Sequence, residues 1–153
     1  NKPIPMMVGS LKQLNEVAYT NGQINRLTKE FMPGGFTIVL NKKECVSDVI
    51  TNGFNTIAIR MPDDDFILEV IKLVGKPLLV TSANLSGQPT GLHFEDVYNE
   101  KKKKIDMIVK GECKGSVSST IVDATTDHLQ ILRSGPINEY QILSVWEVEE
   151  CEI

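Results

Sequence analysis

Apolar residues recur along the chain with two periods, and the longer period, of three to four residues, marks the helices. The hydroxyl of Ser10, with Gln13 three residues later, predicts the start of a helix whose apolar side runs through residues 11–18. A second short helix is predicted at residues 24–31 by the same spacing. Further helices are predicted at residues 66–74, 95–104 and 138–146, the first of them ending at Gly75.

Short apolar runs bounded by turn residues predict the strands. The run at residues 36–40 follows a Pro-Gly-Gly turn, and the run at 55–61 ends before Pro62, which has no N–H to donate. Further strands are predicted at residues 78–81, 106–110, 118–125 and 129–135. Because several neighbouring strands have no helix between them, we predict an α/β fold with a twisted, mixed parallel and antiparallel open sheet flanked by helices. No repeat or long linker divides the chain, so residues 1–153 are expected to form a single domain.

The charge distribution argues against general attraction to nucleic acid. The net charge of −4 comes from the acidic tail at residues 147–153, because acidic and basic residues are otherwise equal in number, at 16 each. A neutral body has no long-range pull on phosphate. The lysine run at residues 101–104 is interpreted as a solvated helix face in preference to an RNA contact.

The remaining composition indicates a cytoplasmic protein. No apolar run approaches the roughly 18 residues that span a bilayer, and the first residues lack the layout of a signal peptide, so no membrane association is expected. Cys45, Cys113 and Cys151 are odd in number and far apart, which favours reduced thiols over a disulfide framework or a zinc site.

Small polar residues and two arginines stand where predicted strands begin or end. Arg60 closes "TIAIR" and Arg133 closes "LQIL", while the series "TSAN" follows one strand and "SST" opens another. Ligands of open α/β sheets bind beyond strand ends, and guanidinium groups pair with carboxylate or phosphate. The alternatives are that these are turn residues and solvated surface arginines, and that "PGGF" is a tight turn. No catalytic Ser-His-Asp spacing is present, and His93 and His128 have no partner at motif spacing. The local pattern thus predicts an anion-binding α/β domain and leaves enzymatic activity open.

Four segments in a defined order and spacing resemble one family. They are "MPGGFTIVL", "NTIAIRMPD", "PLLVTSANLSGQPT" and "SSTIVDAT…LQILRSGPI". Together they resemble the YrdC/TsaC family, the L-threonylcarbamoyladenylate synthases, from Lys2 to Ile142. The resemblance implies that the protein condenses L-threonine, bicarbonate and ATP, with Mg²⁺, to threonylcarbamoyl-AMP and pyrophosphate, and that the product feeds the t6A modification of tRNA.

The same resemblance implies roles for six residues. Arg60 would hold the threonine carboxylate, with Ser82 and Ser119 completing the amino-acid pocket. Contacts to ATP would come from Thr56, Asn84 and Arg133. No residue is expected to act as a covalent nucleophile, because positioning and neutralisation of phosphate charge suffice for this reaction.

The chain departs from the family pattern at several places. Pro33-Gly34-Gly35 stands where the family has Pro-Gly-Pro, and "PDD" at residues 62–64 where it has "PDH". Where the family often has a threonine near the nucleotide, this chain has Leu92 in register, and its own Thr90 is out of register. The family's "PT-[DE]-T-x-YGL" and K-x-R motifs do not occur, so the chain is expected to correspond to roughly the last three-quarters of a synthase.

Two other functions stay open at this point. One is a non-catalytic RNA-binding module with the same fold, which would bind tRNA in a salt-dependent way without ATP. The other is a carbamoyl-transfer domain of the hydrogenase-maturation type, which would use carbamoyl phosphate in place of threonine.

Overall fold

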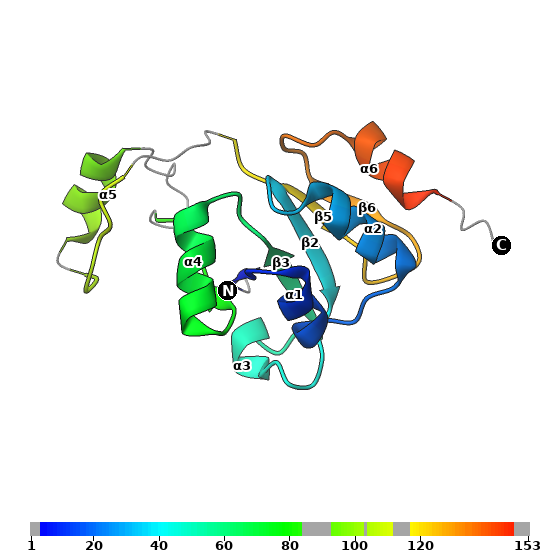
Figure 1. The fold of residues 1–153 in the computed structure, drawn as a ribbon, viewed down its shortest axis with the longest axis horizontal. Helices are drawn as coiled ribbons and strands as arrows, with labels where there is room; N and C mark the ends of the chain where they lie inside the picture. The colour runs from blue at the N-terminus through cyan, green and yellow to red at the C-terminus, as the bar shows by residue number, and fades with distance from the viewer. Residues whose placement is uncertain (1–3, 84–92, 103, 112–116, 149–153) are drawn as a thin grey trace. The chain divides into compact units, whose positions relative to one another are not determined.

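The structure, a computed structural model, describes residues 4–83, 93–102, 104–111 and 117–148. The chain divides into two compact units (Figure 1). The first, here the sheet unit, comprises Asn1–Val80 and Ser118–Ile153, and the second, here the α5 unit, comprises Thr81–Val117. Each unit is described by itself.

The sheet unit is built on a six-stranded sheet with the order β4-β1-β3-β2-β5-β6 in its described residues. Neighbours β1 and β3 are parallel, as are β2 and β5, whereas β1/β4, β2/β3 and β5/β6 are antiparallel. The predicted mixed open sheet is therefore confirmed. The strands are β1 (Met6–Met7), β2 (Phe36–Asn41), β3 (Thr56–Arg60), β4 (Leu78–Leu79), β5 (Thr120–Asp123) and β6 (Gln130–Arg133).

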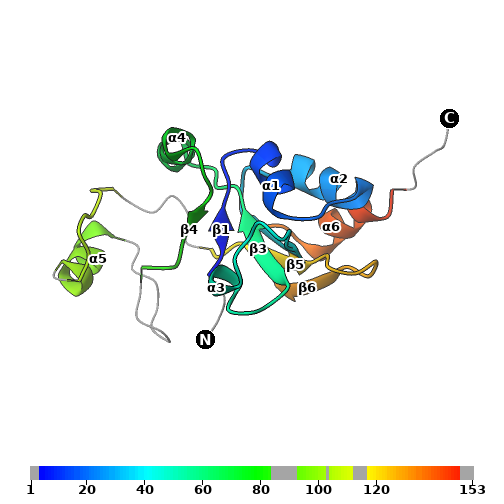
Figure 2. The same ribbon diagram turned by 90° about the horizontal axis from the view of Figure 1, so that it is seen from below.

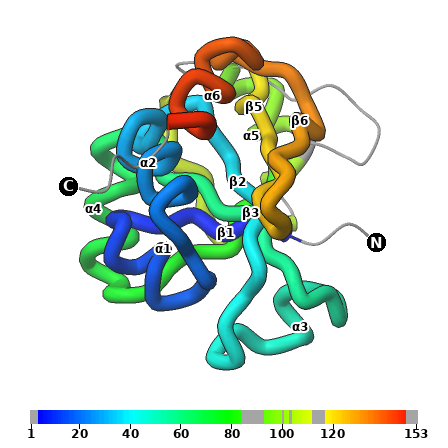
Figure 3. The backbone as a smooth tube through the Cα atoms, turned by 90° about the vertical axis from the view of Figure 1, so that its right-hand side faces the viewer, coloured from blue at the N-terminus to red at the C-terminus, as the bar shows by residue number. Residues whose placement is uncertain are grey.

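Three helices of this unit cover one face of the sheet. They are α1 (Leu11–Val17), α2 (Gly22–Phe31) and α6 (Glu139–Trp146), and Figure 2 shows them on the same side of the strands. The apolar sides of these helices pack into one core with the buried strand residues, through Leu14, Leu27 and Ile142. Helices α2 and α6 lie side by side, and Gln23 Nε2 donates to the carbonyl of Trp146 at 3.2 Å (Figure 3). Two further helices complete the unit, α3 (Asp48–Thr51) and α4 (Asp65–Val74).

The helix boundaries follow from side-chain and glycine caps. The Ser10 hydroxyl accepts from the backbone N–H of Gln13, as the sequence predicts, and Asn21 does the same for Ile24 at 2.8 Å. Gly75 ends α4 in the left-handed conformation, with φ 72°, which a residue without Cβ adopts at little cost. These caps confirm the predicted start of α1 and the predicted end of α4.

Alternation along the strands gives the sheet two chemically different faces. On β2 the core face is formed by Phe36, Ile38 and Leu40, all fully buried, and on β3 by Ile57 and Ile59. Because successive side chains point to opposite faces, the intervening residues belong to the second face. That face carries the polar residues considered below.

The α5 unit has one helix in its described residues, α5 (Phe94–Lys101), and no side chain of the unit whose burial is described is buried. The predicted strand at residues 106–110 is wrong, because this segment is not in a strand and its apolar side chains face solvent: Met107 is 78% and Val109 54% exposed. A strand needs a neighbouring strand for its hydrogen bonds, and alternation alone does not supply one. The short elements β1 and α3 were not predicted. None of the helices in the described segments has the length and apolar character needed to span a membrane.

Candidate anion-binding site

Four polar residues meet at one end of the sheet, on its second face. They are Thr37, Arg60, Ser119 and Arg133, contributed by β2, the end of β3, the residue before β5 and the end of β6. Since β2 is antiparallel to β3 and parallel to β5, and β6 is antiparallel to β5, strands β3 and β6 end where β2 and β5 begin. The fold thus brings together residues that are up to 96 positions apart in the sequence.

Ser119 is the centre of this group. Its hydroxyl lies 2.8 Å from the hydroxyl of Thr37 and accepts from Arg133 Nη2 at 3.1 Å. The backbone carbonyl of Ser119 also accepts from Arg133 Nε, at 3.0 Å. The Thr37 and Ser119 side chains are both buried, so the two bonds to Ser119 hold one side of the Arg133 guanidinium in a fixed place.

Arg60 is held by the turn that precedes β2. Its Nε donates to the carbonyl of Gly34 at 3.0 Å, and the N–H of Gly34 donates to the carbonyl of Met61 at 2.9 Å. The turn has no room for side chains, because a Cβ on Gly34 would lie 2.9 Å from the Phe31 carbonyl oxygen and one on Gly35 would lie 2.5 Å from Pro136 Cγ. The Pro-Gly-Gly segment is a tight turn, and it also orients an arginine.

The two guanidinium groups create a local excess of positive charge. Burial lowers the pKa of Arg60, and the positive charge of Arg133 lowers it further. No carboxylate of the described residues is within ion-pair distance of either arginine. Asp48 and Glu69, for example, pair with Lys42 and Lys72. A half-buried arginine beside a second arginine, without a carboxylate partner in the described part of the chain, is a site that favours an anion.

The loop after β6 packs directly against the start of β5. A Cβ on Gly135 would lie 2.6 Å from the Ser118 carbonyl oxygen and closer still to the Thr120 backbone nitrogen. The Thr120 hydroxyl donates to the Ile137 carbonyl at 2.8 Å and accepts from the Ile137 N–H at 3.0 Å. This packing keeps Arg133 next to Ser119.

Not all predicted site residues meet here. Thr56 opens β3 and pairs with Asn41, four residues from Arg60 and therefore about 13 Å along the strand, at the opposite end. Ser82 belongs to the α5 unit, in which it is exposed. Asn84 lies outside the described residues, as do Thr90 and Leu92. The roles of Thr56, Ser82 and Asn84 stay predictions.

Thr37 and Gly34 are the members of the site that sequence reasoning missed. Thr37 lies inside the apolar run "FTIVL", where a single threonine is usual in a strand. Its position between Phe36 and Ile38 places it on the face opposite the core, and that alternation was the available signal.

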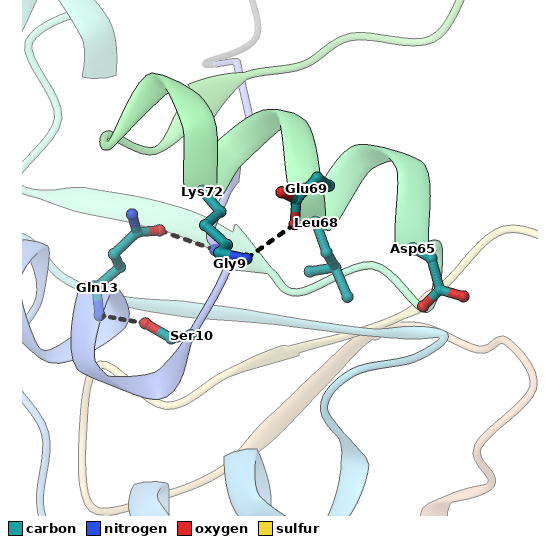
Figure 4. A pocket seen from close by; sticks show the side chains of 7 residues that line it. All are labelled: Gly9, Ser10, Gln13, Asp65, Leu68, Glu69 and Lys72. Carbon is teal, nitrogen blue, oxygen red and sulfur yellow. Dashed lines mark hydrogen bonds and ion pairs between the residues drawn. The ribbon is translucent and has the colours of Figure 1, made fainter.

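A cavity of about 530 Å³ lies between α1 and α4 (Figure 4). Its lining includes Gly9, Gln13, Glu69 and Lys72. The Lys72 ammonium is already paired with Glu69 at 3.1 Å, and Gln13 Oε1 accepts from the Gly9 N–H at 2.8 Å. Its charged and polar groups therefore largely satisfy one another, unlike the two arginines.

Comparison with known proteins finds relatives of this chain over most of its length. A putative threonylcarbamoyl-AMP synthase of Methanocaldococcus jannaschii is 34% identical over 138 residues, which are 90% of this chain and 64% of the relative. The solved structure of P. abyssi Sua5 complexed with L-threonine is 35% identical, with a TM-score of 0.87, over 94% of this chain and 43% of that one. E. coli YciO is 25% identical, with a TM-score of 0.84, over 92% and 69%. The chain thus spans less than two-thirds of the length of the first two of these proteins.

The sequence model of the Sua5/YciO/YrdC family, described as "Telomere recombination", matches residues 1–135, which include most of the sheet unit and the whole α5 unit. The resemblance predicted from the four motifs is confirmed: the chain belongs to the Sua5/YciO/YrdC family.

Proposed function

We propose that this chain provides the L-threonine site, and part of the ATP site, of a threonylcarbamoyl-AMP synthase. The observation that carries the proposal is the pair Arg60 and Arg133, which converge at one sheet end without a described carboxylate partner. The solved structure of P. abyssi Sua5, which is 35% identical, is a complex with L-threonine. L-threonine carries the carboxylate that a pair of arginines would bind.

Arg60 is the residue proposed to hold the threonine carboxylate. Its Nε is engaged by Gly34, so the guanidinium plane is set while Nη1 and Nη2 remain for two parallel bonds to a carboxylate. Ser119 and Ser82 are proposed to complete the amino-acid pocket. Thr56, Asn84 and Arg133 are proposed to contact ATP, with Arg133 presenting the Nη1 that Ser119 leaves unused.

The proposed reaction needs no protein nucleophile. The threonine amine attacks the carbon of bicarbonate, water leaves, and a carbamate forms. A carbamate oxygen then attacks the α-phosphorus of ATP, and pyrophosphate leaves as the P–O bond to it breaks. The chain would contribute orientation of the two reactants and positive charge near the oxygens that gain negative charge.

Mg²⁺ is proposed to arrive with ATP as part of the substrate. No group of three His, Cys, Asp or Glu that could hold a metal occurs among the residues the structure describes, and the described site is cationic. Mg²⁺ is commonly bound through substrate phosphates and water, so a site of this kind suits Mg-ATP better than a resident ion. The product would be consumed by transfer of threonylcarbamoyl to tRNA, which makes tRNA or its modifying proteins the expected partners, in the cytoplasm.

The test is calorimetric titration of the chain with L-threonine and with Mg-ATP. We expect saturable L-threonine binding, and a loss of roughly 10- to 100-fold in Arg60→Ala, because a charge-assisted hydrogen bond contributes about 1.5–3 kcal/mol. Arg26→Ala is the matched control, since Arg26 donates to the Val148 carbonyl away from this site. L-threoninamide, which lacks the carboxylate, should not bind.

Two outcomes would count against the proposal. One is a chain that is folded by circular dichroism and yet binds no L-threonine. The other is equal affinity of the unmodified chain and Arg60→Ala. Tight binding of carbamoyl phosphate in place of L-threonine would favour the carbamoyl-transfer alternative.

A further inference from the structure

We propose that Asp123 recognises the ribose hydroxyl groups of the bound nucleotide through its carboxylate oxygen Oδ2. The inference rests on the proposed function, because it places the middle of ATP between two contacts that are themselves proposed, Arg133 and Thr56. It adds a residue that determines specificity for a ribonucleotide and that has been given no role above.

The sheet register places Asp123 in a row of three side chains on the second face. Val39 of β2 pairs with Ala58 of β3 on one side and with Asp123 of β5 on the other. Each of the three alternates with residues that point into the core, so all three side chains lie on the opposite face. Ala58, Val39 and Asp123 are called the middle row below.

The middle row lies between the two proposed ATP contacts. Arg133 pairs with Ile121, two residues before Asp123 on β5. Thr56 pairs with Asn41, two residues beyond the middle row on β2. Two residues of a strand span about 7 Å, so the middle row is about 7 Å along the strands from either pair. Because ribose joins the base of ATP to its phosphates, a nucleotide that reaches from Arg133 to Thr56 has its ribose over the middle row.

The Asp123 carboxylate is held in place through only one of its oxygens. Oδ1 accepts from the Thr125 N–H at 2.9 Å and from the Thr125 hydroxyl at 2.6 Å. Oδ2 has no hydrogen-bond partner among the residues that the structure describes. An asparagine would serve this turn equally well, because its single side-chain oxygen can accept both bonds. The turn therefore accounts for Oδ1 and leaves Oδ2 as a fixed acceptor with two lone pairs.

The charges of the second face decide which part of the ligand meets Oδ2. The Asp123 carboxylate repels a phosphate, whereas Arg60 and Arg133 attract it, so the phosphates belong at the arginine end. Ribose has two neighbouring hydroxyl groups that donate hydrogen bonds without carrying a charge, and Oδ2 has a lone pair for each. Ala58 in the same row has only a methyl group, which leaves room above the sheet for the sugar ring.

The first experiment needs no substitution. The unmodified chain is titrated calorimetrically with Mg-ATP and with the Mg complex of 2′,3′-dideoxyATP, which lacks both hydroxyl groups. We expect the dideoxy nucleotide to bind about 10- to 100-fold more weakly, as for the loss of hydrogen bonds to a charged acceptor. Equal affinity for the two nucleotides would overturn the inference, while Mg-ATP binding itself would still support the proposed function.

The second experiment tests whether Asp123 is the residue responsible. Asp123→Asn keeps an oxygen for the bonds from Thr125 and replaces Oδ2 by an NH₂ group, which cannot accept. We expect Mg-ATP to bind this variant about 10- to 100-fold more weakly and no better than the dideoxy nucleotide does. Its L-threonine affinity and its urea midpoint should stay close to those of the unmodified chain. Asp127→Asn is the matched control, because it removes the same charge from an exposed residue of the β5–β6 connection, and it should keep the preference for Mg-ATP.

Three further results would overturn the inference. A preference for Mg-ATP that persists in Asp123→Asn would show that another group recognises the ribose. A loss of L-threonine affinity in the same variant would show that the carboxylate faces the amino acid instead. Failure of the folded, unmodified chain to bind Mg-ATP would overturn this inference together with the proposed ATP contacts, while L-threonine binding tests the rest of the proposed function separately.

Discussion

Arg60 and Arg133 lie at the same sheet end but are held differently. Arg133 makes two hydrogen bonds to Ser119, one to its carbonyl and one to its hydroxyl, whereas Arg60 makes one bond within the described residues, from Nε to the Gly34 carbonyl. The lowered pKa of Arg60 reflects its burial first and the charge of Arg133 second. An anion bound between the two arginines would raise the pKa of Arg60 again, because it would give the buried guanidinium a partner of opposite charge and offset its repulsion by Arg133.

Gly135 is the residue whose replacement should disturb this arrangement most directly. In Gly135→Ala the new methyl group would lie 2.6 Å from the Ser118 carbonyl oxygen and the Ser119 carbonyl carbon. Because these are backbone atoms of the strand start, the strand or the loop must move, and we expect a loss of about 1–3 kcal/mol in unfolding free energy. Urea denaturation measures it.

Gly111→Ala is the matched control for that substitution. A Cβ on Gly111 has no heavy atom within 4 Å, so its unfolding midpoint should stay near that of the unmodified chain. Gly135→Ala should also bind L-threonine more weakly, since Ser119 would shift relative to Arg133. Equal midpoints for the two variants would show that the loop accepts the methyl group without strain.

At the scale of secondary-structure elements, hydrogen-bonded caps determine where several helices begin and end. Helix α6 begins with a capping box, in which the Asn138 side chain accepts from the Gln141 N–H at 2.9 Å and Gln141 Oε1 accepts from the Asn138 N–H at 3.0 Å. The helix then places Ile142 and Trp146 in the core. The cap thus sets the position of two core residues.

Asn138→Ala should therefore destabilise the sheet unit by about 1 kcal/mol, the usual effect of losing an N-cap acceptor. Unfolding followed by the fluorescence of Trp146, the only tryptophan, reports directly on this helix. Asn138→Asp retains an acceptor and should stay close to the unmodified chain. If alanine and aspartate behave alike, the cap does not contribute to stability.

The elements also show where sequence patterns succeed and fail. Helical spacing and caps predicted α1, α2, α4 and α6 because these signals are local. Residues 106–110 have the same kind of apolar run as a true strand but find no neighbour, while the two-residue strand β1 exists because β3 and β4 flank it. Pairing is a non-local property, and short runs do not encode it.

At the scale of the whole molecule, the two units differ in burial. The apolar core belongs entirely to the sheet unit, where eighteen buried hydrophobic residues form one cluster. In the α5 unit no side chain whose burial is described is buried, and the Phe94 and Tyr98 rings stack on each other with centroids 5.4 Å apart. The free energy of local opening should accordingly differ between the units.

Hydrogen–deuterium exchange measures that difference. We expect the amides of α5 to exchange quickly, and those of β2, β3 and β5 to be the best protected, because opening them would expose the core. Helix α2 is the matched control: it is also helical but buries Ile24, Leu27 and Thr28, and it should exchange more slowly than α5. Equal protection of α2 and α5 would contradict this picture.

The sequence by itself determined the family, most of the elements and three of the four polar side chains that meet at the site. Arg60, Ser119 and Arg133 stand in motifs at strand ends, and the alternation of each strand is a local property that assigns side chains to faces. Tertiary structure alone decided the strand order, which sets β2 between β3 and β5 and so brings Thr37 against Ser119, 82 residues away. It also decided how each arginine is held, since the Gly34 and Ser119 groups that orient them come from other segments. The physical reason for this division lies in the range of each property. The secondary structure of a segment, and the sheet face on which each of its side chains lies, depend on residues near it in the sequence. Strand register, burial and hydrogen-bond direction depend on which distant strands pack together.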